Sequence, residues 1–140
     1  MSRKMHLKTL GTPEHNREQY EVAFDEEFAA EVRQFPQAVR EKLKAVAIIL
    51  EQEGPLLGRP YADTLKGSCH ANMKELRFNA DGGAWRVAYA FDTRRNAILL
   101  VGGDKAGAGQ ERFYRNMIRI ADERFERHLQ LLHSSKKGLK

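Results

Sequence analysis

Two short segments of this sequence alternate charged with apolar residues, at positions where the charges could bind or transform a ligand. In 74–78, Glu75 and Arg77 alternate with apolar side chains. In 85–92, Arg86 stands between bulky side chains and shares its side of the segment with two alanines. This alternation is typical of strands, whose successive side chains point to opposite faces. Guanidinium groups on a shallow sheet face would suit an anionic ligand such as a phosphate.

The same arginines have a simpler interpretation. Arg77 and Arg86 could form cross-strand ion pairs with Glu75 or Asp92 on a solvated face, since antiparallel sheets commonly expose one face to water. The two segments alone leave both interpretations open.

The elements before these segments follow from periodicity. Residues 20–24 alternate and predict a short first strand. Apolar stripes at helical spacing predict two helices, over 25–35 and 36–54, with Asp25 as an N-cap and a glycine ending the second. Residues 55–72 are predicted to form a loop, because glycine and proline punctuate them.

The second half of the chain predicts a three-stranded meander over 73–105, with a hairpin turn at 81–83. Residues 97–101 are apolar throughout, which favours a central strand buried on both faces. A long amphipathic helix is predicted over about 110–132.

Together these elements predict an α/β (α+β) fold. We expect a small mixed or antiparallel sheet of about four strands, with an N-terminal helix hairpin on its aromatic face and a C-terminal helix. The face that carries Glu75, Arg77 and Arg86 is expected to stay open and basic, with the Arg86 side chain exposed.

Length and charge narrow the class of protein. The chain has 140 residues, which suits one domain, and 24 Lys and Arg against 19 Asp and Glu give a net charge of +5. This surplus favours acidic partners such as nucleic acid. The single cysteine, Cys69, indicates a reducing compartment, and with its neighbour His70 it offers no metal-ligand spacing. We therefore expect no metal or cofactor.

Three regions are predicted along the chain: a flexible polar leader over 1–19, one domain over 20–132 and a basic tail over 133–140. No apolar run is long enough to span a bilayer, and no secretory signal follows the basic start. We expect a cytoplasmic protein that does not contact a membrane.

The order of these elements and their particular residues resembles the RelE/ParE toxin superfamily of bacterial toxin–antitoxin systems, and within it the phage-derived, HigB-like branch. The resemblance covers about 20–132 and is carried by five short motifs. They are Leu65-Lys66-Gly67, Glu75-Leu76-Arg77, Trp85-Arg86-Val87-Ala88-Tyr89, Gly102-Gly103-Asp104-Lys105 and Phe113-Tyr114.

The resemblance implies a toxin that cuts mRNA in the ribosomal A site and is held inactive by a cognate antitoxin, in this branch a helix-turn-helix protein. It implies functional roles for Arg86, Lys105 and Tyr114. Where RelE-type enzymes carry two lysines on the first meander strand, this chain has Met73 and Glu75 on either side of Lys74. A lysine base is therefore not expected there.

Cleavage of RNA by its own 2′-hydroxyl needs a base, an acid and positive charge on the phosphorane. Arg86 and Arg77 suit the charge stabilisation, because arginine stays protonated. Glu75 is the candidate base and Lys105 the candidate acid, while Tyr114 could stack on a nucleobase or exchange a proton. Because no metal cluster is visible in the sequence, we expect a metal-independent endoribonuclease. Further RNA contacts are predicted at Arg77, Lys74, Lys66 and Arg112.

Two other functions fit the same sequence. ParE-like members of the superfamily poison gyrase by binding, without the nuclease residues. A basic adaptor that binds nucleic acid without catalysis would also show the net charge of +5.

Overall fold

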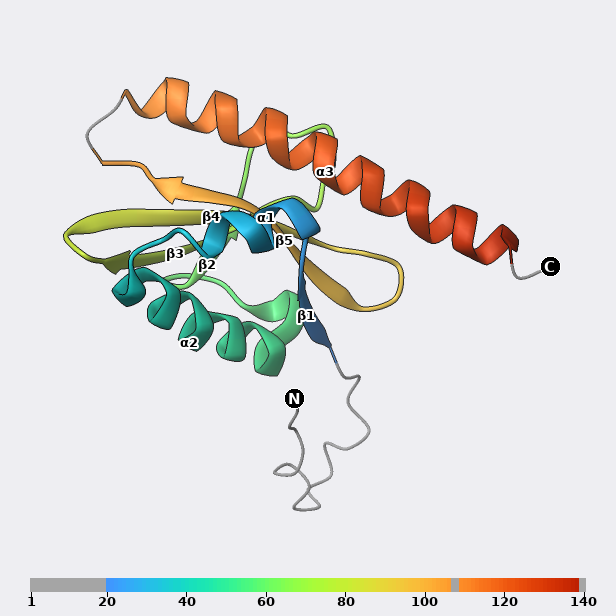
Figure 1. The fold of residues 1–140 in the computed structure, drawn as a ribbon, viewed down its shortest axis with the longest axis horizontal. Coiled ribbons are helices and arrows are strands. Elements are labelled where there is room, and N and C mark those ends of the chain that lie inside the picture. The colour runs from blue at the N-terminus through green and yellow to red at the C-terminus, as the bar shows by residue number, and fades with distance from the viewer. Residues whose placement is uncertain (1–19, 107–108, 139–140) are drawn as a thin grey trace, which may run out of the picture.

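A five-stranded sheet lies between helices in the computed structural model, which describes residues 20–106 and 109–138 (Figure 1). The predicted leader, 1–19, lies outside the described residues, as do the last two residues of the predicted tail. The elements in chain order are β1 (Glu21–Phe24), α1 (Glu26–Val32), α2 (Gln37–Glu53), the short 3-10 helix η3 (Gly54–Leu56), β2 (Ala62–Thr64), β3 (Lys74–Ala80), β4 (Gly83–Phe91), β5 (Asn96–Asp104) and α3 (Gln110–Gly138).

The sheet is mixed, as predicted, with strand order β1-β5-β4-β3-β2. β1 pairs parallel with β5, and the other neighbours pair antiparallel. The fifth strand is β2, whose three residues lie within the predicted loop and pair with β3. A strand this short carries no alternation that could reveal it in the sequence, so the expected count of four was one too low.

The N-terminal helices form where their caps predict. The Asp25 carboxylate accepts hydrogen bonds from the backbone N–H groups of Glu27 and Phe28, each at 3.0 Å, and so begins α1. α2 ends at Gly54, whose φ of +61° favours glycine and whose missing Cβ leaves room for the Tyr20 ring. The two helices cover the aromatic face of the sheet, which confirms the predicted hairpin.

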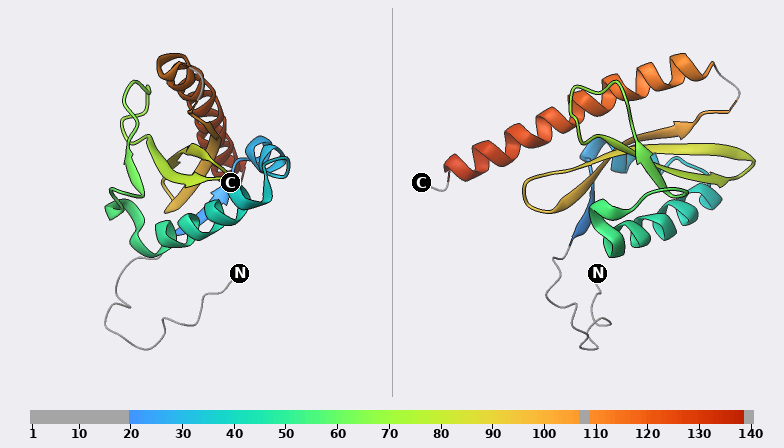
Figure 2. Two further views of the ribbon diagram at one scale, coloured as in Figure 1. Left: turned by 90° about the vertical axis from the view of Figure 1, so that its left-hand side faces the viewer. Right: turned by 180° about the vertical axis from the view of Figure 1, so that it is seen from behind.

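The opposite face of the sheet is covered by α3, so the prediction of an open face is wrong (Figures 1 and 2). Met117, Ala121 and Phe125 of α3 pack in one core cluster with Ala88 and Ala90 of β4. The alanines leave room for a helix to approach closely, and the apolar stripe of α3 must be buried against some partner. The small residues that suggested a shallow binding surface for a ligand instead form the surface on which α3 packs.

α3 continues to Gly138, beyond the predicted end near residue 132, because nothing between the two positions breaks a helix. Every helix within the described residues is too short or too polar to span a bilayer.

One contact joins α3 to the turn between β4 and β5. The Asp92 carboxylate, 8% exposed, accepts hydrogen bonds from the backbone N–H groups of Arg94 (2.8 Å) and Asn96 (2.9 Å), and its Oδ2 lies 2.9 Å from His128 Nε2. Burial acts to raise the pKa of Asp92, but these hydrogen bonds outweigh it and hold the pKa below its usual value.

We expect Asp92→Asn to lower the free energy of unfolding at pH 7 by about 1–3 kcal/mol, because several hydrogen bonds to a carboxylate are lost or weakened. A carboxyl with a lowered folded-state pKa stabilises the protein above its unfolded pKa of about 3.9 and loses this contribution as the pH falls through the folded value. The stability gap between wild type and variant should therefore narrow below about pH 4. Urea unfolding at pH 7 and pH 3 measures the difference in unfolding free energy between the two proteins. An equal difference at both pH values would contradict the lowered pKa of Asp92.

Candidate functional site

Glu75 is the centre of a polar cluster between the sheet and α3. Its carboxylate lies on the face of β3 that α3 covers, and the residue is 5% exposed. The Tyr114 hydroxyl, near the start of α3, donates a hydrogen bond to Glu75 Oε1 at 2.9 Å. Arg77 Nη1 donates to Glu75 Oε2 at 3.0 Å. Tertiary packing thus brings a residue of α3 to a carboxylate 39 positions earlier in the chain.

Arg86 completes the cluster from β4, where it pairs across the sheet with Arg77. Its Nε lies 4.0 Å from Glu75 Oε1, and its Nη1 donates to the backbone carbonyl of Trp85 at 2.9 Å. Nε is buried and has no hydrogen-bond partner within the described residues. Two guanidinium groups against one carboxylate leave local positive charge, which suits an anion.

The expectation of an exposed Arg86 is wrong, because the residue is only 6% exposed. The cause is α3, which covers the face on which Arg86 stands. Arg86→Ala would therefore remove a cation from beside a buried carboxylate. Such a change is expected to lower stability, so this variant cannot separate a loss of function from a loss of stability. Of the ion pairs considered from sequence, both arginines pair with Glu75, Arg77 at 3.0 Å and Arg86 at 4.0 Å.

Tyr114 is held as a neutral phenol at physiological pH. Burial raises its pKa, and the hydrogen bond to Glu75 and the charge of that carboxylate raise it further, while Arg86 acts in the opposite direction. A phenol with a raised pKa donates a proton or a hydrogen bond and does not act as a base near neutral pH.

The remaining predicted residues lie around this cluster or away from it. The backbone N–H of Lys105 donates to the Ala84 carbonyl at 2.8 Å, which extends the β4–β5 pairing and puts Lys105 on the same sheet face as Arg86. Lys74 alternates with Glu75 and pairs with Tyr89, so it belongs to the opposite face. Lys66 is an exposed residue of the loop between β2 and β3.

Arg112 is exposed on α3, where it lines an open groove beside β5 with a volume of about 500 Å³. Arg115 and Arg119 line the same groove, and sequence reasoning missed both. The signal was present, because positions 112, 115 and 119 follow the i, i+3, i+7 spacing of one helix face. These arginines form a basic surface next to the end of α3 that carries Tyr114.

Comparison with known proteins identifies the class of this fold and the family of the chain. Its fold is RelE-like: the free state of a double-arginine mutant of Escherichia coli toxin RelE aligns with a TM-score of 0.53, at 17% identity, over 72% of this chain and 95% of that one. Residues 30–126 match the model of the family described as phage-derived protein Gp49-like, and the chain belongs to that family.

Two relatives come from Mycobacterium tuberculosis (strain ATCC 25618 / H37Rv). The chain is 52% identical over 85 residues to a protein named as toxin HigB3, covering 61% of this chain and 72% of that protein. It is 46% identical over 89 residues to one named as toxin HigB2, covering 63% of this chain but only 44% of that protein. The resemblance to the HigB-like branch is confirmed.

Proposed function

We propose that this chain is the toxin of a type II toxin–antitoxin system and inhibits translation by cutting mRNA. The relatives named as HigB toxins and the RelE-like fold support the toxin class. The observation that supports the nuclease is the cluster around Glu75. Its carboxylate accepts hydrogen bonds from Arg77 and Tyr114, and the Arg86 guanidinium lies 4.0 Å away.

Each group has a role that its chemistry allows. Glu75 accepts the proton of the attacking 2′-hydroxyl, as the O2′–P bond forms. Arg77 and Arg86 stabilise the charge of the phosphorane through their guanidinium groups. Tyr114, a phenol with a raised pKa, donates a proton to the 5′-oxygen as the P–O5′ bond breaks. Lys105, the candidate acid from sequence, lies on the same sheet face and is the alternative proton donor.

To reach Glu75, RNA has to displace hydrogen bonds that this carboxylate forms in the free protein. Both oxygens of Glu75 accept hydrogen bonds in the free protein, from Tyr114 and Arg77. We propose that the phosphate draws Arg77, which is more exposed than Arg86, away from the carboxylate. Such a site gains from a substrate held in place, which is consistent with a message positioned by the ribosome. Lys66 and the arginines at 112, 115 and 119 would contact the flanking RNA backbone.

The partner proposed to restrain this activity is a cognate antitoxin. The toxin names of the relatives support an antitoxin in general terms. We propose further, from the HigB-like resemblance, that it is a helix-turn-helix protein.

The test is controlled expression of the full chain in a bacterium, with message 5′ ends mapped by primer extension. We expect growth arrest, loss of protein synthesis and new 5′ ends within coding regions, all relieved by coexpressing the antitoxin. Arrest with intact messages and DNA-damage signalling would point instead to a gyrase poison. Normal growth despite abundant soluble protein would reject the toxin.

A further inference from the structure

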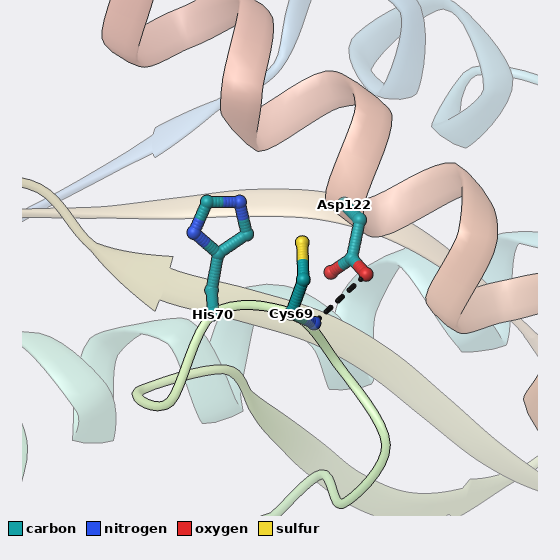
Figure 3. Close-up of side chains that lie close together, drawn as sticks. All are labelled: Cys69, His70 and Asp122. Carbon is teal, nitrogen blue, oxygen red and sulfur yellow. Dashed lines mark hydrogen bonds between the residues drawn. The ribbon is translucent and has the colours of Figure 1, made fainter.

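A second cluster of reactive side chains lies between α3 and the loop that joins β2 to β3 (Figure 3). Cys69 and His70 come from the loop, and Asp122 comes from the helix. One ligand atom from each residue lies within 4.8 Å of the others. A thiol, an imidazole and a carboxylate are the three ligand types that Zn²⁺ accepts in proteins.

The carboxylate is oriented toward the loop by hydrogen bonds. Asp122 Oδ2 accepts from the backbone N–H of Cys69 at 3.1 Å, and Oδ1 accepts from the Ser68 hydroxyl. The Ser68 oxygen in turn accepts from the backbone N–H of His70 at 2.9 Å. These bonds connect the loop to the helix and orient the Asp122 carboxylate, so that it lies near the Cys69 and His70 side chains. Contacts that orient the ligands are typical of metal sites.

The imidazole of His70 lies beside a carboxylate without forming a hydrogen bond to it. Its Nε2 is buried and accepts or donates no hydrogen bond within the described residues. The closest acidic atom is Glu126 Oε1, at 3.6 Å, which is too long for a hydrogen bond. The ring is fixed in place by edge-on packing against Phe125, with centroids 5.0 Å apart. A fixed, buried ring nitrogen without a hydrogen bond points to a ligand that the protein alone does not supply.

We propose that Cys69, His70 and Asp122 bind one Zn²⁺ ion, with Glu126 as the fourth ligand. Glu126 follows Asp122 by one helical turn, so both carboxylates lie on the same side of α3. Zinc bonds of about 2.0–2.3 Å put tetrahedral ligand atoms roughly 3.3–3.8 Å apart. The cluster would therefore contract by about 1 Å, which the exposed Glu126 side chain and the exposed Cys69 allow.

The ion would connect the loop before β3 to α3, and both segments lead to residues of the Glu75 cluster. The loop that carries Cys69 leads directly into β3 with Glu75, and α3 carries both Asp122 and Tyr114. A zinc ion bridging loop and helix would hold the Tyr114 hydroxyl at the carboxylate. Zinc binding itself does not depend on the proposed nuclease function, so the two can fail separately.

The test uses the full chain, stripped of metal with a chelator and titrated with Zn²⁺ and, separately, with Co²⁺. We expect one zinc per chain by elemental analysis, a rise in melting temperature with zinc, and a thiolate-to-cobalt charge-transfer band. Cys69→Ser should remove that band and weaken zinc binding at least tenfold, and it should fold, because Cys69 contacts Asp122 through its backbone N–H.

His133→Gln is the matched control, since His133 is an exposed histidine of α3 outside the cluster and its loss should change nothing. Glu126→Gln, a change at an exposed position, should weaken binding without disturbing the fold. Absence of stoichiometric zinc in the wild type would overturn the proposal. So would equal zinc affinity in wild type, Cys69→Ser and Glu126→Gln, because it would indicate binding elsewhere.

Discussion

Glu75→Gln should reduce message cleavage by about 10²–10⁴-fold, the range that a positioned general base contributes. The substitution keeps the size of the side chain and an oxygen that can accept from the Tyr114 hydroxyl, but it removes the proton acceptor. It also turns the ion pair with Arg77 into a neutral contact. We expect the variant to fold, to bind its antitoxin and to be tolerated by growing cells.

The measurement is the rate of appearance of new message 5′ ends after induction at matched protein levels. Glu41→Gln is the control, because Glu41 is an exposed residue of α2 that contacts Gln37 and lies on the other side of the sheet. It should leave cleavage unchanged. Full cleavage by folded Glu75→Gln would exclude Glu75 as the base, while leaving the toxin class intact.

The largest effect on stability is expected at Arg124, which joins α3 to α1 and β5. Its guanidinium donates to both oxygens of Glu31, at 2.9 and 2.6 Å, and to the carbonyl of Leu100 at 2.8 Å. Arg124 is 9% exposed and its bond to the Leu100 carbonyl is buried, whereas the Glu31 side chain is 44% exposed. Arg124→Ala should lower the free energy of unfolding by about 3 kcal/mol, because it leaves a buried carbonyl without its donor and removes the packed side-chain stem.

Arg127→Ala is the matched control on the same helix. Its side chain is 46% exposed and pairs with Asp25 and Glu27, so we expect a loss below about 1 kcal/mol. Urea unfolding of the three chains measures both values. Equal losses of unfolding free energy for the two variants would show that burial does not determine how much these ion pairs contribute to stability.

Local patterns were sufficient to predict most of the elements of this fold. The alternation of β3 and β4 depends only on neighbouring residues, as do the Asp25 cap and the glycine that ends α2. The same alternation placed Glu75, Arg77 and Arg86 on one face, and the structure brings these three residues together. β2 could not be predicted, because its three residues are a strand only through pairing with β3.

Apart from β2, the sequence by itself therefore determined the order of the elements, the residues that share a sheet face and the HigB-like family. Only the tertiary structure decided what covers each face. α3 packs on the alanines of β4, and this buries Arg86, carries Tyr114 to Glu75 and brings Asp122 to Cys69, 53 residues away. The physical reason is that sequence periodicity shows which residues share one side of a helix or strand. Whether that side is buried depends on which other helix or strand packs against it.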